Sequence, residues 1–323
     1  MKAVHYSANG GPEVMTYGDL PDAVAGPDSL VIAVSWISIE GGDLLNRLVT
    51  PPPHTPFVPG YQASGIVVSV GERVSRFKVG DRVVGFNWSG SHAELFEVPE
   101  HYAFLVPDEL DLRVASTIPV AFGTAHDSLF EYGQLKAGEV VLVQGAAGGV
   151  GLAAVQFAAR AGATVIGTAS SHERLDRIRP FGLHHGIDYR TEDIADRVRE
   201  ITGGRGVDLV VDLAGGQGKD ALVQSMRAHG RYAVVGASSG ALPSFGFFEL
   251  IRKAMHVFGI SLGRDMHTDR ARAMLTDITR SIAAGEISMP IDREFDLSEA
   301  VAAHDYVANG HPFGRVVMKV APE

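Results

Sequence analysis

The sequence of 323 residues predicts an α/β protein that joins an antiparallel, barrel-like β unit to a doubly wound parallel sheet. Three observations predict this fold class. Residues 1 to about 119 carry short alternating patterns separated by Gly and Pro turns, which is typical of antiparallel strands. From about residue 139, apolar strand runs alternate with helical patterns, which is typical of βαβ units. A glycine-rich turn joins the first strand of that second part to its first helix.

The first part is expected to consist of antiparallel strands. The run "SLVIAVSWISI" (29–39) alternates, and one face of the expected strand carries Leu30, Ile32, Val34 and Trp36. The runs "SGIVVSVG" and "DRVVGFNW" follow, with turns at Gly71 and at Gly80-Asp81. These short strands and tight turns predict the barrel-like unit.

The second part is expected to alternate strands and helices. Apolar runs predict strands at 140–143, 165–168, 208–211, 232–235 and 257–260, with a weaker one near 185–188. Helical patterns fill the gaps at 149–161, 172–179, 192–202 and 217–228. Near the end, a helix is expected from its N-cap Ser298 to Gly310. The strand "GRVVMKV" that follows is expected to return to the first part.

Composition excludes several classes of function. A formal net charge of −10 argues against a nucleic-acid binder that works by neutralising phosphates. The chain has no cysteine, which excludes disulfides, a thiol nucleophile and Cys-ligated metal centres. The N-terminal run "MKAVHYSANGG" lacks the apolar core of a signal peptide, and no apolar run is long enough to span a membrane. We expect a cytoplasmic, soluble protein.

The glycine-rich turn predicts a dinucleotide site. In "VVLVQGAAGGVGLAAVQ" a strand enters a turn of small residues and leaves it as an Ala-rich helix that ends at Gly162. Glycines let the backbone approach a pyrophosphate, whose charge is bound by the N–H groups of the helix N-terminus. Tight packing of the turn alone is the alternative. The residues predicted to contact the pyrophosphate are Gly145, Ala147, Gly148, Gly149 and Val150.

The end of the next strand predicts which dinucleotide is bound. NAD-binding folds place a carboxylate about 20 residues after the glycines, to receive the ribose 2′-OH. Here the strand ends in Ala169, Ser170 and Ser171, and Arg174 follows. Two charge-assisted contacts to a 2′-phosphate would favour NADPH over NADH about a hundredfold. The alternative is that Ser171 only caps the next helix and Arg174 is solvated.

Three motifs resemble the medium-chain dehydrogenase/reductase superfamily: "GERVSRFKVGDRV" (71–83), "GTAHDSL" (123–129) and "GAAGGVG" (145–151). Within it the chain resembles the zinc-independent quinone oxidoreductases related to ζ-crystallin, over nearly its whole length. The resemblance implies a GroES-like β-barrel catalytic domain, a doubly wound six-stranded Rossmann NADPH-binding domain, and a homodimer. The implied bounds are 1–119 with 261–323 for the first domain and 120–260 for the second.

A zinc alcohol dehydrogenase of the same superfamily is excluded. Its "GHE" segment, which helps to bind the catalytic metal, stands here as Gly60-Tyr61-Gln62, and its structural zinc site needs four cysteines. Without a metal to polarise an alcohol, we expect hydride transfer to an acceptor that is already electrophilic, a quinone or an enone.

The resemblance also implies roles for single residues. Thr124 matches the residue that contacts the nicotinamide end, and Tyr189 matches a Tyr beside the basic residue Arg174. Further residues are expected to close over the ribose and nicotinamide: Gly236, Ala237, Ser238, Phe258, Gly259 and Ile260.

The expected substrate side departs from the family pattern "N-x-x-D-x-Y-x-R". Glu40, Asp43, Leu45 and Arg47 occupy its four positions, so that a phenol is lost at Leu45. Asp43 and Arg47 are expected to form an ion pair. Glu40 is a proton donor if burial raises its pKa, and a solvated or ion-paired Glu40 is the alternative. The catalytic candidates are thus Glu40, Asp43 and Tyr61, and no general acid stands out.

Other residues are candidates for lining a substrate cleft, with core or surface roles as alternatives. They are Tyr61, Asn87, Trp88, His92 and the apolar run "PSFGFFELI" (243–251). For the run 243–251, a core or dimer contact is the alternative.

The sequence therefore predicts an NADPH-dependent, metal-free reductase of a small-molecule quinone or enone. The runs "PVAFGTAH" and "VQGAAGGVG" also resemble the enoyl reductase domains of polyketide synthases, so a trans-acting enoyl-thioester reductase is one alternative. The other is an NADPH-binding scaffold or redox sensor with little turnover.

Overall fold

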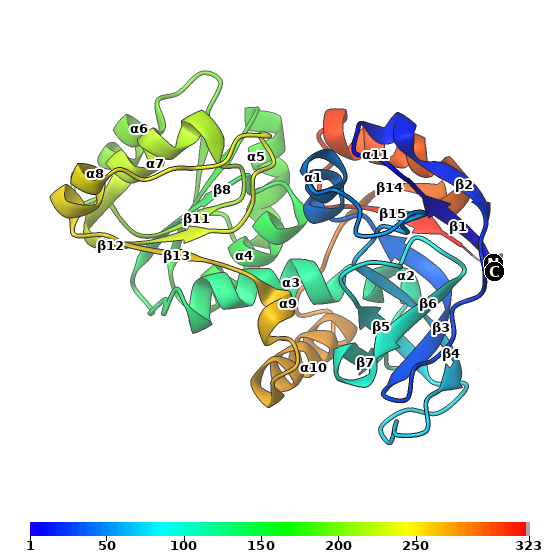
Figure 1. The fold of residues 1–323 in the computed structure, drawn as a ribbon. Coiled ribbons are helices and arrows are strands. Elements are labelled where there is room, and N and C mark those ends of the chain that lie inside the picture. Colours follow the sequence, from blue (N-terminus) through cyan, green and yellow to red (C-terminus); the bar gives the residue numbers. More distant parts are fainter. Residues whose placement is uncertain (321–323) are drawn as a thin grey trace. The chain divides into compact units, whose positions relative to one another are not determined.

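The computed structural model describes residues 1–320, and the chain divides into two compact units (Figure 1). Unit 1 is Met1–Gly123 together with the chain from Leu262 onward, and unit 2 is Thr124–Ser261. None of the helices within residues 1–320 is both long and apolar enough to cross a membrane.

Unit 1 is built on a mixed seven-stranded sheet of order β14-β15-β3-β4-β5-β7, with β6 paired to β3. Its strands are β3 (Ser29–Ser38), β4 (Gln62–Val70), β5 (Arg82–Phe86), β6 (Leu95–Pro99), β7 (Ala103–Leu105), β14 (Ile291–Asp296) and β15 (Arg315–Lys319). All neighbours are antiparallel except β14 and β15. A separate hairpin pairs β1 (Lys2–His5) with β2 (Thr16–Asp19). Because β15 pairs with β3, the predicted return of the last strand is confirmed.

A bulge in β3 corrects the predicted face of that strand. The register against β4 shifts between Val34 and Trp36, so the alternation moves by one residue. Leu30, Ile32 and Val34 belong to the core of unit 1 as predicted, but beyond the bulge Ile37 and Ile39 take the place expected for Trp36. Trp36 is buried elsewhere, with the Lys319 ammonium 6.0 Å from its ring.

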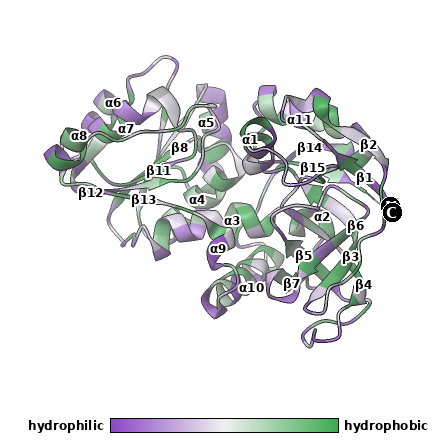
Figure 2. Ribbon diagram, in the orientation of Figure 1, coloured by the Kyte–Doolittle hydropathy of each residue, from purple (hydrophilic) through white to green (hydrophobic). Residues whose placement is uncertain are grey.

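The helices of unit 1 begin with α1 at the end of β3. They are α1 (Gly41–Val49), α2 (Leu112–Ala115), α3 (Ile118–His126, which runs into unit 2), α9 (Leu262–Asp265), α10 (Asp269–Ala283) and α11 (Ala300–Asn309), with short 3₁₀ turns at Pro12–Val14, Glu100–Tyr102 and Leu297–Glu299. Figure 2 shows α3 in the colours of hydrophobic residues. The predicted N-cap Ser298 is wrong. Asp296 caps the turn instead, because its N–H bonds the Glu299 carboxylate at 3.0 Å.

Unit 2 contains the predicted six-stranded parallel sheet, in the order β10-β9-β8-β11-β12-β13. Its strands are β8 (Val140–Gln144), β9 (Thr164–Ala169), β10 (His185–Asp188), β11 (Val207–Asp212), β12 (Met226–Val234) and β13 (His256–Gly259). The chain runs from β8 outward to β10 and then returns to β11, beside β8. In such sheets ligands bind outside the carboxyl ends of the strands at this switch point.

The helices of unit 2 are α4 (Gly149–Arg160), α5 (His172–Ile178), α6 (Ile194–Ile201), α7 (Lys219–Ser225) and α8 (Phe247–Lys253), with short turns at Asp127–Glu131, Arg179–Phe181 and Gly216–Gly218. Apolar residues of α6, α7 and α8 pack in one core cluster with residues from all six strands of the sheet. The helix expected to reach residue 228 ends at Ser225. The reason is that Met226 already pairs with Val207 of β11, so β12 begins six residues before the predicted strand.

Candidate active site

The glycine-rich turn of unit 2 has the shape of a pyrophosphate cradle. Gly145 adopts a φ of +71°, and α4 starts at Gly149 with its first N–H groups lacking partners inside the helix. At Gly151 a Cβ would lie 2.4 Å from the carbonyl oxygen of Gly145, so no other residue fits the turn. Thr168 of β9 holds the turn, accepting from Gly145 N at 3.3 Å through its hydroxyl. These residues fit a dinucleotide pyrophosphate at the switch point of the sheet.

The predicted 2′-phosphate residues come together at the ends of β9 and β10. Tyr189 donates its N–H to the Ala169 carbonyl at 3.2 Å, directly before Ser170 and Ser171. Ser171 does cap α5, since its hydroxyl accepts from Arg174 N at 3.3 Å, and this leaves its own proton to donate. The carboxylate nearest in sequence, Glu173, is exposed in the first turn of α5.

Two buried residues that the sequence analysis missed shape the loops after β11 and β12. Asp212 accepts the Tyr232 hydroxyl at 2.7 Å and the Gly215 N–H at 2.8 Å. Its carbonyl accepts the N–H of Gly236 at 3.2 Å, and the N–H of Ser238 bonds the next carbonyl at 3.3 Å. The Gly236-Ala237-Ser238 segment is thus tied to the carboxyl end of β11. In the sequence, the signal that could have indicated Asp212 is an acidic residue directly after the apolar run of a predicted strand.

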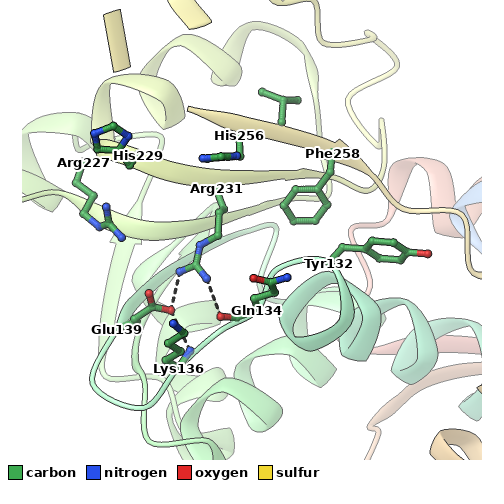
Figure 3. Close-up of a pocket in the computed structure, with 10 residues that line it drawn as sticks. Tyr132, Gln134, Lys136, Glu139, Arg227, His229, Arg231, His256 and Phe258 are labelled. Carbon is green, nitrogen blue, oxygen red and sulfur yellow. Dashed lines mark hydrogen bonds and ion pairs between the residues drawn. The ribbon is translucent and has the colours of Figure 1, made fainter. Parts of the chain in front are cut away.

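Phe258 lies in a surface groove of about 520 Å³ at the outer strand β13 (Figure 3). Its ring centroid is 6.4 Å from that of Tyr132. Arg231 crosses the groove to Glu139, at 2.6 Å, and donates to the Gly133 carbonyl. Basic side chains form much of the remaining lining: Lys136, Arg227, His229 and His256.

The remaining predicted cofactor residues end two elements of unit 2. Gly259 ends β13, and Ile260 follows it and bonds the Val234 carbonyl at 3.0 Å. Thr124 lies in α3, where its carbonyl accepts the Ser128 hydroxyl at 2.6 Å. The contacts of Thr124, Phe258, Gly259 and Ile260 with a cofactor stay predictions.

In unit 1, Glu40 precedes α1 and is buried in a network of donors. Its Oε1 accepts from Gln62 Nε2 at 2.6 Å and from the Ser38 hydroxyl at 3.1 Å, and it pairs with the Arg315 guanidinium. Gln62 in turn accepts the Val120 N–H at 2.8 Å. Burial raises the pKa of Glu40 to about 7, against the lowering effect of Arg315, Ser38 and Gln62. Glu40 is therefore both buried and ion-paired, and its role as a proton donor stays a prediction. Through these bonds it links β3, β4, α3 and β15.

Asp43, in the first turn of α1, is also buried. Its Oδ2 accepts the Glu40 N–H at 2.8 Å. Burial raises the pKa of Asp43 to about 8, and the negative charge of Glu40 adds to the rise. The predicted ion pair with Arg47 is wrong for the chain as described through residue 320. Arg47 points to other partners, since its Nε donates to the Gly10 carbonyl at 3.2 Å.

Arg47 begins a buried chain of hydrogen bonds that runs in one direction. A guanidinium only donates, so His304 Nδ1, at 2.6 Å from Arg47 Nη1, must accept. His304 then carries its proton on Nε2 and donates it to His92 Nε2 at 2.9 Å, which leaves the His92 proton on Nδ1, facing Ser91 Oγ at 3.3 Å. Burial lowers the pKa of His92 to about 3 and that of His304 well below its usual range. His92 is fully buried, so its predicted place in a substrate cleft is wrong.

Tyr61 is half-buried and rigidly held beside α1. Its Oη accepts from Asn46 Nδ2 at 2.6 Å. Its ring stacks on Phe86, with centroids 5.9 Å apart and planes inclined by 28°. A Cβ on Gly42 would lie 2.3 Å from Cε2 of Tyr61, so this glycine lets the ring lie against the helix.

The other predicted cleft residues are placed differently. Trp88 is 50% exposed and meets Phe86 edge-on at 5.6 Å. Asn87 instead shapes a turn, donating to the Glu97 carbonyl at 3.0 Å. Phe247 and Phe248 of α8 are 70% and 71% exposed on unit 2. Within residues 1–320, no three His, Asp or Glu side chains are grouped as metal ligands.

Two family profiles match the chain. Residues 26–108 match the alcohol dehydrogenase GroES-like domain, and residues 149–280 match the zinc-binding dehydrogenase family.

Curated relatives match over most of the chain. A quinone oxidoreductase of Pseudomonas aeruginosa is 32% identical over 321 residues, which cover 98% of this chain and 99% of the relative. A 2-haloacrylate reductase of a Burkholderia species is 31% identical, with 96% of each chain covered. A phthioceranic/hydroxyphthioceranic acid synthase of Mycobacterium bovis is 30% identical over 300 residues, which cover 91% of this chain but only 14% of the synthase.

Solved structures share the fold from end to end. A quinone oxidoreductase of Pseudomonas syringae has a TM-score of 0.94 and 29% identity, with 99% of each chain covered. An Escherichia coli quinone oxidoreductase complexed with NADPH has a TM-score of 0.94 and 27% identity, with 100% of each chain covered.

Proposed function

Because the chain belongs to the zinc-independent quinone oxidoreductase branch of the medium-chain dehydrogenase/reductase superfamily, we propose that it is an NADPH-dependent, metal-free reductase of quinones or α,β-unsaturated carbonyls. The observation that carries this proposal is the pairing of a glycine cradle with a strand end that presents hydroxyls instead of a carboxylate. The NADPH bound by an Escherichia coli structural neighbour and the alkene acceptor in the name of the 2-haloacrylate reductase support it.

The residues of unit 2 would hold the cofactor. The first turn of α4 would bind the pyrophosphate, and Ser170, Ser171 and Arg174 would bind the 2′-phosphate. Bound NADPH supplies a hydride. The acceptor would already be electrophilic, because the branch is zinc-independent and no three His, Asp or Glu side chains of residues 1–320 are grouped as metal ligands.

An enoyl-thioester reductase is the second candidate, and the match to one segment of a large acid synthase supports it. The two candidates differ in whether the substrate carries a thioester-linked carrier such as CoA. A reductase of thioesters should prefer crotonyl-CoA over a short enone such as 3-penten-2-one by tenfold or more in kcat/KM. A quinone or enone reductase should show no such preference.

The testing experiment uses NADPH deuterated at its transferable C4 position, under anaerobic conditions, with a simple enone and a benzoquinone offered separately. Deuterium on the β-carbon of the enone product would establish alkene reduction. Turnover of the quinone with an inert enone would establish a quinone reductase. If the cofactor binds and neither acceptor oxidises it, the proposal is refuted and the protein is an NADPH-binding scaffold.

We also propose that the protein is a cytoplasmic homodimer. β13 forms an outer edge of the six-stranded sheet, and α8 exposes Phe247, Phe248 and Ile251 on the same unit. Sedimentation velocity should give the mass of a dimer, and Phe248→Asp should shift it toward the monomer. Cell fractionation tests the location.

A further inference from the structure

Tyr61 has a phenol proton that the structure leaves available. Asn46 Nδ2 donates to Tyr61 Oη, so the phenol oxygen accepts in that bond and its own O–H points elsewhere. Among the described residues Asn46 is the one hydrogen-bond partner of this oxygen, and Tyr61 is only half-buried. A buried phenol without an acceptor would be costly, whereas a half-buried one can donate to a bound molecule.

The phenol is held in place on three sides. Phe86 stacks on one face of the ring, Gly42 of α1 lies against its edge, and Asn46 fixes the oxygen. A donor held in advance of the reaction stabilises a developing charge more than one that must reorganise. Leu45 stands where the family pattern has a Tyr, so α1 itself supplies no phenol, and Tyr61 lies beside this helix.

The phenol keeps its proton under ordinary conditions. Burial raises the pKa of Tyr61, and the nearby carboxyls of Asp43 and Glu40 raise it further, against the lowering effect of Asn46. Such a group donates a hydrogen bond but is a poor acid. It can stabilise an oxyanion without becoming a tyrosinate.

We propose that Tyr61 is a catalytic residue whose O–H donates to the substrate oxygen that becomes negative on hydride transfer, and that Asn46 is its positioning residue. This inference rests on the proposed function, because it needs a carbonyl acceptor. The hydride and its electron pair form a C–H bond at the electrophilic carbon, and the π pair moves to oxygen. With an enone, water then supplies one proton to the α-carbon of the enolate. With a quinone, the carbon that received the hydride loses a proton to water, which restores the aromatic ring, and water supplies a proton to each of the two oxygens. NADPH leaves oxidised as NADP⁺.

The test compares Tyr61→Phe with Tyr102→Phe. Tyr102 also packs edge-on against Phe86, at 5.5 Å, but its hydroxyl is used in a 3.2 Å bond to the Gly263 carbonyl. Removing one oxyanion donor lowers kcat about 100-fold, so Tyr61→Phe should lose that much with an enone and with a benzoquinone. Its Kd for NADPH should stay within twofold of the wild type. Tyr102→Phe should keep kcat within threefold.

Asn46→Asp tests the direction of the orienting bond. A carboxylate at residue 46 accepts the Tyr61 O–H and withdraws it from the substrate, so activity at pH 8 should fall at least tenfold. Protonation restores a donor to Tyr61 Oη, so the activity of Asn46→Asp relative to Asn46→Ala should rise as pH falls. The other groups that act on Tyr61 (Asp43, Glu40 and Tyr6) are common to both variants, so the ratio isolates residue 46.

The outcomes separate the inference from the function it rests on. If the wild type reduces an acceptor and Tyr61→Phe keeps more than a third of kcat, Tyr61 is not the donor and the proposed function stands. A flat activity ratio between Asn46→Asp and Asn46→Ala across pH would overturn the positioning role of Asn46. If the wild type binds NADPH and reduces neither acceptor, both the function and the inference fall.

Discussion

Replacing Asp43 with Asn should flatten the pH dependence of stability in unit 1. Asp43 is buried at the start of α1, and burial raises its pKa from an ordinary 3.8 to about 8. Between these values the folded protein holds a proton that the unfolded chain has released. Stability therefore falls as pH rises through this window, and it levels off above about pH 8.

The magnitude follows from the size of the window. One proton contributes about 1.4 kcal/mol per pH unit, so the wild type should lose about 3 kcal/mol relative to Asp43→Asn between pH 5 and pH 7. Asn can still accept the Glu40 N–H bond that Asp43 Oδ2 accepts at 2.8 Å. The variant thus removes the titration while keeping the bond. Glu40 titrates in both proteins, and because its charge raises the pKa of Asp43, the difference contains this coupling as well as the proton on Asp43.

The assay is urea unfolding followed by tryptophan fluorescence at pH 5, 6, 7 and 8. Both tryptophans, Trp36 and Trp88, lie in unit 1 with Asp43, so the fluorescence signal reports the unfolding of unit 1. Asp277→Asn, which changes an exposed carboxylate on α10, is the matched control and should leave the pH dependence unchanged. A constant difference between Asp43→Asn and the wild type across this range would show that Asp43 is ionised in the folded protein and would refute the reasoning.

Three further predictions concern the cofactor turn and the buried histidines. Ser170→Asp places a carboxylate at the end of β9 and should lower the ratio of NADPH to NADH affinity about a hundredfold, measured by fluorescence titration. An unchanged ratio would show that Ser170 does not contact the 2′-phosphate. Gly151→Ala brings a Cβ within 2.4 Å of a backbone oxygen and should abolish NADPH binding, whereas Gly246→Ala, which meets nothing within 4 Å, should bind normally. Nitrogen-15 NMR should find His304 protonated on Nε2 and His92 on Nδ1 from pH 5 to 8, and the opposite tautomers would contradict the direction of the Arg47 chain.

Local features of the fold were predictable, and contacts between distant segments were not. The glycine turn follows from residues within one strand–turn–helix unit, so the parallel sheet and the start of α4 could be read from spacing. The bulge in β3 depends on its partner strand and left no mark in the alternation of residues 29–39. For this reason the face of Trp36 was predicted wrongly.

The same limit applies to the candidate site. Glu40 pairs with Arg315, and His92 meets His304, across more than 200 residues of sequence. The sequence alone therefore left open whether Glu40 is solvated, ion-paired or a proton donor. Asn46 and Tyr61 are 15 residues apart, yet their bond depends on how the residue before β4 lies against the middle of α1.

The charges buried around α1 point to one electrostatic role. Glu40 and Arg315 neutralise each other, and Asp43 is protonated below about pH 8. The hydrogen-bond partners of Arg47 are the neutral imidazole of His304, the Met15 sulfur and the Gly10 carbonyl, so its guanidinium keeps its positive charge. The first turn of α1, where Gly42 lies against Tyr61, is the positive end of a helix dipole and would favour a negative oxygen on the substrate. Ionisation of Asp43 in the same turn would oppose that field, so kcat should fall as pH rises through about 8 in the wild type. In Asp43→Asn it should not fall, and a parallel decline in both proteins would show that this charge has no part in the reaction.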